Sequence, residues 1–141
     1  MHCTGFAMLE RHIIRSDEDV SIAVVIAQAR ARQCGFNPDG IQRLGTAVAE
    51  LARNICKYCP HSGGDMLITE STDGAGKGRL TVQFRDNGPG ISDVKQAMQE
   101  HYSSSGSLGL GLSGVKRLVD EFAITTASGQ GTVVTISLER C

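Results

Sequence analysis

The sequence predicts an α+β two-layer sandwich, in which three main helices cover one face of a five-stranded, mostly antiparallel or mixed sheet. Apolar residues recur at helical spacing in three segments, and they alternate in the manner of strands in others. Glycine-rich turns join strand-like segments in pairs, which is typical of hairpins. A chain of 141 residues suits one core, so residues 1–141 are expected to form a single domain.

The first part of the chain is expected to form a strand and then two helices. The strand is expected over Met8 to Arg15. Ser16 and the acids after it suit the start of a helix, whose apolar spacing runs from Val20 to Gln33. The next helix is expected from about Gly40 to Tyr58, with Asp39 as its N-cap.

The second part is expected to hold two hairpins with a third helix between them, which gives the order β-α-α-β-β-α-β-β. Its strands and helix are expected over Asp65 to Ser71, Arg79 to Arg85, Gly111 to Phe122 (the helix), Ala123 to Ala127 and Thr132 to Leu138. The stretch from Gly88 to Leu108 shows only a short helical signal, around Asp93 to Glu100. Long loops in compact domains are usually functional, so we expect a lid there.

Composition narrows the classes of function. A formal net charge of -1 disfavours a nucleic-acid partner, which normally needs a basic face. No apolar run reaches the roughly 18 residues of a membrane span, and Met1 to Glu10 does not have the pattern of a secretory signal. Five irregularly spaced cysteines suit reduced thiols and a cytoplasmic location. Cys56 and Cys59 form a C-x-x-C pair, and the simpler interpretation is two small residues near a helix end.

Two polar side chains on the second helix form the first candidate site. Glu50 and Asn54 are four residues apart, so they lie side by side on one helix face. Their oxygens suit Mg²⁺, and the carboxylate can also accept a proton. A solvated pair with a local hydrogen bond is the alternative, and the spacing alone leaves both interpretations open.

Two glycine-rich segments supply the other candidates. Asp86 ends an apolar strand and precedes Gly88 and Gly90, so it suits an exocyclic amine such as that of adenine beside a flat glycine wall. A turn closed by an Asx hydrogen bond is the alternative. Gly109 and Gly111 open the third helix, whose free N–H groups suit a phosphate, although a hinge would have the same composition.

Four segments resemble, in order, the motifs of the GHKL (Bergerat-fold) ATPase and kinase superfamily of gyrase, Hsp90, histidine kinases and MutL. They are Glu50 to Asn54 for its N box, Asp86 to Ile91 and Gly109 to Leu112 for two glycine boxes, and Gly131-Thr132 for the last. Within that superfamily the chain is most similar to the RsbT-type serine/threonine switch kinases of bacterial partner-switching modules. These kinases are related to anti-sigma factors of the RsbW and SpoIIAB type.

The resemblance implies an ATP-dependent protein serine/threonine kinase with ATP and Mg²⁺ as cofactors. Glu50 would be the general base, and Asn54 would hold Mg²⁺. Asp86 would bind the adenine amine, with support from Thr132. The remaining nucleotide contacts would come from Gly88, Gly90, Gly109, Leu110, Gly111 and Leu112.

The resemblance also implies protein partners. The substrate would be a STAS-domain antagonist or scaffold protein of a stressosome-type stress response, and a PP2C-type phosphatase or a sigma factor would be a further partner. An anti-sigma factor, or an ATP-bound module that sequesters its partner, remains the alternative, and a homodimer is compatible with either. Anti-sigma relatives often carry a basic residue before the second glycine box, where this chain has Gly106-Ser107-Leu108. Either Lys116, Arg117 or a partner residue replaces it, or turnover is slow.

Overall fold

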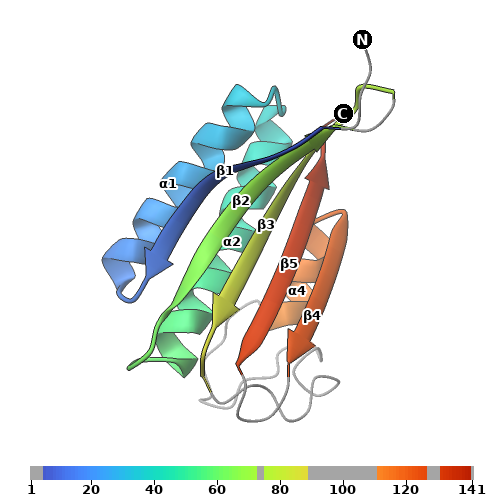
Figure 1. Cartoon of the computed structure of the whole chain (residues 1–141). Coiled ribbons are helices and arrows are strands. Elements are labelled where there is room, and N and C mark those ends of the chain that lie inside the picture. The colour runs from blue at the N-terminus through green and yellow to red at the C-terminus, as the bar shows by residue number, and fades with distance from the viewer. Residues whose placement is uncertain (1–4, 73–74, 89–110, 127–130, 141) are drawn as a thin grey trace.

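The computed structural model describes residues 5–72, 75–88, 111–126 and 131–140, and it confirms the predicted two-layer α+β architecture (Figure 1). In these residues five strands form one sheet in the order β1-β2-β3-β5-β4, with every neighbouring pair antiparallel. The helices lie on one face of the sheet (Figure 1). The elements are β1 (Gly5–Ile14), α1 (Asp17–Gln33), α2 (Pro38–Tyr58), β2 (Gly64–Thr72), β3 (Gly78–Asp86), α4 (Gly111–Leu118), β4 (Glu121–Thr126) and β5 (Thr132–Glu139).

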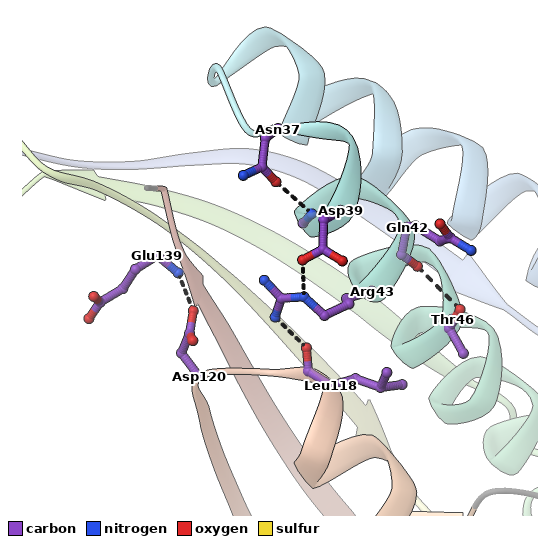
Figure 2. A network of polar contacts seen from close by, with 9 residues as sticks. Asn37, Asp39, Gln42, Arg43, Thr46, Leu118, Asp120 and Glu139 are labelled. Atoms are coloured by element: carbon purple, nitrogen blue, oxygen red, sulfur yellow. Dashed lines mark hydrogen bonds and ion pairs between the residues drawn. The ribbon is translucent and has the colours of Figure 1, made fainter.

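The start of α2 differs from the prediction. The N-cap is Asn37, whose side chain accepts a hydrogen bond from the Gly40 backbone N–H at 2.8 Å (Figure 2). Pro38 follows it in the first turn, where its fixed φ favours the helix and its missing N–H costs nothing. The expected cap, Asp39, therefore lies inside the helix, where its carboxylate pairs with Arg43.

The third predicted helix is too long. α4 ends at Leu118, and Phe122 belongs to β4, which begins at Glu121 rather than at Ala123. Asp120 fixes the change of direction, because its N–H donates to Ser137 O at 2.9 Å. Its carboxylate also accepts from Glu139 N–H at 2.7 Å (Figure 2). These long-range bonds override the helical spacing of the apolar residues. The expected end of the strand, Ala127, lies outside the described residues.

An aliphatic core joins the helices to the sheet. Fully buried alanines of α1, such as Ala23 and Ala27, allow that helix to pack closely on α2. α2 contributes Leu44, Val48 and Leu51, and these side chains are buried against the inner face of the sheet. This packing fixes the direction of α2, which carries Glu50 and Asn54. No helix among the described residues is long and apolar enough to cross a membrane.

The candidate segments meet at one end of the molecule. The C-terminal end of α2, the end of β3 and the starts of β5 and α4 all lie at the lower end in Figure 1. In the sheet register Asp86 is paired with Gly64 on one side and with Thr132 on the other. Apart from Gly88, the expected lid over Gly88 to Leu108, including its helical signal at 93–100, lies outside the described residues.

Candidate functional site

Asp86, the last residue of β3, forms the centre of the candidate site. Its Oδ1 accepts hydrogen bonds from the Gly88 N–H at 2.9 Å and from the Thr132 N–H at 3.2 Å. The Asx hydrogen bond of the alternative interpretation is therefore present. Both bonds end on one oxygen, and an ionised carboxylate offers about four acceptor positions. The same side chain can close the turn and still accept a donor from a ligand.

Two glycines let the backbone pass close to Asp86. A Cβ built on Gly131, whose φ is +85°, would lie 2.2 Å from the Asp86 carbonyl oxygen. A Cβ on Gly88 would lie 2.3 Å from the Cys59 Sγ. Both distances are far below van der Waals contact, so only glycine allows this arrangement of β3, β5 and the turn. Gly88 is therefore required by its packing against Cys59, and its role as a wall beside adenine stays a prediction.

Thr132 contacts Asp86 through its backbone rather than through its side chain. Its N–H donates to Asp86 Oδ1, and its hydroxyl lies 3.0 Å from the Thr126 hydroxyl. The Thr126 hydroxyl also donates to Gly131 O at 3.1 Å. Thr132 is buried, and this network ties the start of β5 to the end of β4. The side chain at position 132 thus holds the strand end whose backbone orients Asp86.

Cys59, which the sequence did not single out as a site residue, also contacts Asp86. It is the C-cap residue of α2 and is 5% exposed. Burial, together with the charge of Asp86 and a side-chain hydrogen bond to it, raises the pKa of the Cys59 thiol to about 11, and the Gly88 N–H opposes this effect. The thiol is therefore protonated at neutral pH and donates to the carboxylate. The C-x-x-C partner, Cys56, has its pKa raised by burial and by Asp17 and Asp19 of α1, so the two thiols have different surroundings.

Glu50 and Asn54 lie on the half of α2 that leads to this end of the sheet. The Glu50 side chain is 15% exposed, and it accepts a hydrogen bond from Arg53 Nη1 at 3.2 Å. Asn54, one turn further along, is half-buried. Glu50 is thus paired with an exposed arginine one turn away on the same helix. The Glu50 carboxylate is largely shielded from bulk water and is held by this arginine of its own helix.

The start of α4 supplies the second predicted glycine segment. Gly111 is the first residue of the helix, and Leu112 is buried in the core. The other members of the predicted nucleotide contacts, Gly90, Gly109 and Leu110, lie outside the described residues. At its far end α4 is attached to α2, because Arg43 Nη1 donates to Leu118 O at 2.8 Å while Arg43 Nε donates to Asp39 at 3.0 Å (Figure 2). α2 and α4 are therefore held together as one layer.

Comparisons with known proteins agree with this geometry. The model of a family described as histidine kinase-, DNA gyrase B-, and HSP90-like ATPases matches residues 39–140, which include every residue of the candidate site. The serine/threonine-protein kinase RsbT of Bacillus subtilis is 38% identical over 121 residues, which are 86% of this chain and 89% of RsbT. An anti-sigma F factor of Halalkalibacterium halodurans is 30% identical over 122 residues, 83% of this chain and 82% of that factor.

A solved structure shows the same fold. The structure of the RsbU and RsbW domains of Rv1364c from Mycobacterium tuberculosis superposes with a TM-score of 0.62 at 17% sequence identity. The match covers 98% of this chain but 34% of that one, so this chain corresponds to about a third of the larger protein. At this level of identity the likeness concerns the arrangement of helices and strands.

Proposed function

Because the chain belongs to the family of histidine kinase-, DNA gyrase B- and HSP90-like ATPases, we propose that it is an ATP-dependent protein serine/threonine kinase of a partner-switching pathway. The observation that carries the nucleotide part is the Asp86 carboxylate, oriented by two backbone N–H groups at the end of β3. The 38% sequence identity to RsbT, which extends over most of both chains, supports the kinase part of the proposal.

The described residues fit the adenine end of ATP. The oriented Asp86 carboxylate can accept a hydrogen bond from the exocyclic amine, and the tight turn at Gly88 holds that carboxylate at the end of β3. In the proposal the N–H groups at the start of α4, with Gly111 at its first position, face the phosphates. ATP supplies the phosphoryl group that is transferred.

On α2, we assign the chemistry to Glu50 and the metal to Asn54. Mg²⁺ keeps several waters and is commonly shared between phosphates and one or two protein oxygens, so a single amide oxygen suits it. Glu50 takes the proton of the acceptor hydroxyl on its carboxylate while Arg53 stays paired with it. A general base of this kind contributes about 10²- to 10⁴-fold to a rate. Positioning and charge neutralisation account for most of the remainder in phosphoryl transfer.

The proposed substrate is a serine or threonine of a STAS-domain antagonist or scaffold protein, and a PP2C-type phosphatase is the proposed downstream target. The second candidate is an anti-sigma factor, which the similarity to the anti-sigma F factor favours. The two candidates share the nucleotide site and differ in the protein that they bind.

A transfer assay separates the candidates. The protein is incubated with labelled ATP and Mg²⁺, and either a STAS-domain protein from the same organism or a candidate sigma factor is added. We expect label on a serine or threonine of the STAS-domain protein, and no stable complex with the sigma factor. ATP binding without any transfer of label would contradict the kinase proposal and favour a module that acts by sequestration.

A further inference from the structure

Cys59 has a fixed place between α2 and the turn that follows β3. Its backbone N–H donates to Ile55 O at 2.8 Å, and its carbonyl oxygen accepts from the Gly63 N–H at 2.8 Å. The residue is 5% exposed. Because its backbone is held on both sides and its side chain is buried, the position of the sulfur is determined by the fold.

The sulfur lies directly against the turn that carries Asp86. The position of a Cβ on Gly88 would be 2.3 Å from Cys59 Sγ and 3.3 Å from Asp86 Oδ1, so the Gly88 backbone touches both groups. At the same point the Gly88 N–H donates to Asp86 Oδ1 at 2.9 Å. The thiol, the carboxylate and the glycine therefore form one cluster of contacts.

The direction of the thiol hydrogen bond follows from its protonation. With its pKa raised to about 11 by burial and by Asp86, the Cys59 thiol carries its proton at neutral pH. An ionised carboxylate only accepts, so the S–H group is the donor. It adds a side-chain donor to the two backbone N–H groups that already hold Asp86.

We propose that Cys59 is a positioning residue of the adenine site, whose thiol donates to Asp86 and fixes the carboxylate in the orientation that accepts the exocyclic amine. The inference rests on the proposed function, because it requires that Asp86 binds adenine. Cys59 itself does not touch the nucleotide. Its effect is to restrict the carboxylate before binding, which lowers the entropic cost of the adenine contact.

The test compares two nucleotides by calorimetry: ATP, and purine riboside triphosphate, which lacks the exocyclic amine. Cys59→Ala should weaken ATP binding about fivefold, the usual weight of one hydrogen bond, and should leave the affinity for purine riboside triphosphate unchanged. Cys59→Ser keeps a donor and should restore most of the affinity for ATP. Cys56→Ala, which removes the other thiol of α2, should bind both nucleotides as the wild type does.

Two results would overturn the inference: Cys59→Ala binding ATP as tightly as the wild type, or an equal loss for both nucleotides, which would mark a purely structural role. A wild type that binds ATP and purine riboside triphosphate equally would refute the adenine assignment of Asp86 and, with it, the inference. If Cys59→Ala does not fold, infrared spectroscopy of the wild type takes the place of that variant. The S–H stretching band of Cys59 is identified by its loss in Cys59→Ser. The band should shift with ATP and not with the analogue, and an ATP-insensitive band would overturn the inference.

Discussion

At the scale of single residues, Asp86 serves the fold and the proposed ligand with the same carboxylate. Its Oδ1 closes the turn to Gly88 and links β3 to β5 through the Thr132 N–H. Both donors belong to the protein's own backbone, so the fold itself orients the carboxylate. Preorganisation of this kind reduces the free-energy cost of association.

Asp86→Asn should weaken ATP binding at least about tenfold, because a hydrogen bond to a charged acceptor is worth roughly 1.5–3 kcal/mol. The asparagine oxygen can still accept from Gly88 and Thr132, which places its NH₂ group where the adenine amine would approach. Titration calorimetry with ATP and Mg²⁺ measures the change, and circular dichroism checks the fold. An unchanged affinity would refute Asp86 as the adenine ligand.

The sequence alone was enough to propose Asp86 and Gly88 as site residues, because a carboxylate beside glycines after a strand is a local pattern, and their role in binding stays a prediction. The contact of Cys59 with Asp86 could not be predicted in this way, since it depends on where the end of α2 meets β3 in space. The sequence marks Cys59 by the C-x-x-C pair with Cys56 and by its place directly after the helix that carries Glu50 and Asn54, and neither feature indicates Asp86 as its neighbour.

At the scale of elements, the contact between α2 and α4 determines where α4 ends. Val119 and Phe122 continue the helical spacing of Leu112, Val115 and Leu118, so the sequence favoured a longer helix. Arg43 of α2 binds the Leu118 carbonyl, and Asp120 binds β5, and these tertiary bonds select the shorter helix. Local periodicity contains no information about either partner.

Arg43→Ala should lower the free energy of unfolding by about 1–2 kcal/mol, because it leaves the carbonyl at the end of α4 without its donor. Urea denaturation measures the loss. Asp39→Ala is the matched control: it removes the exposed partner of Arg43 but keeps the bond to Leu118, and exposed ion pairs contribute less than about 1 kcal/mol. Equal losses for the two variants would contradict the anchoring role of the Leu118 bond.

At the scale of the whole molecule, the sheet face opposite the helices is held by charged contacts. Asp65 is buried on that face between two arginines of the neighbouring strands, with Arg85 at 2.9–3.0 Å and Arg11 at 2.9 Å. The hydrogen bonds from Arg85 hold the pKa of the Asp65 carboxyl below its ordinary 3.8 against the effect of burial, and Arg11 adds to them. The contact joins β1, β2 and β3 near the end of the sheet that carries Asp86.

A lowered pKa gives a defined dependence of stability on pH. The stabilisation by Asp65 is complete when the pH is above 3.8, the ordinary pKa that the carboxyl has in the unfolded chain. It is lost as the pH falls through the lower pKa of the folded state. Asp65→Asn should cost about 2 kcal/mol at neutral pH, and its difference from the wild type should shrink in acid. Urea denaturation between about pH 7 and about pH 3 measures this, with the exposed Glu18→Gln as control. A difference independent of pH would contradict the charge pairing.

The overall architecture was predictable because hydrophobic periodicity and turn composition are strong signals for this chain. The order of elements agreed with the prediction, and the errors concern element ends: the helix ends at Asn37 and Leu118, the start of β4 at Glu121, and β1, which spans Gly5–Ile14 rather than Met8 to Arg15. No local sequence pattern predicted that β3 pairs with β5 rather than with β4. That pairing is what brings Thr132 beside Asp86, so part of the site emerges only at the level of the folded sheet.

The most direct test of the kinase proposal compares the wild type with Glu50→Gln at an ATP concentration that saturates both. The measurement is the rate at which label passes from ATP to the STAS-domain protein. We expect Glu50→Gln to bind ATP normally and to lose transfer by about 10²-fold or more, because the amide cannot take the hydroxyl proton. Arg53→Ala, which removes the partner of Glu50 but keeps the base, should retain transfer. Transfer by Glu50→Gln at the wild-type rate would contradict the account.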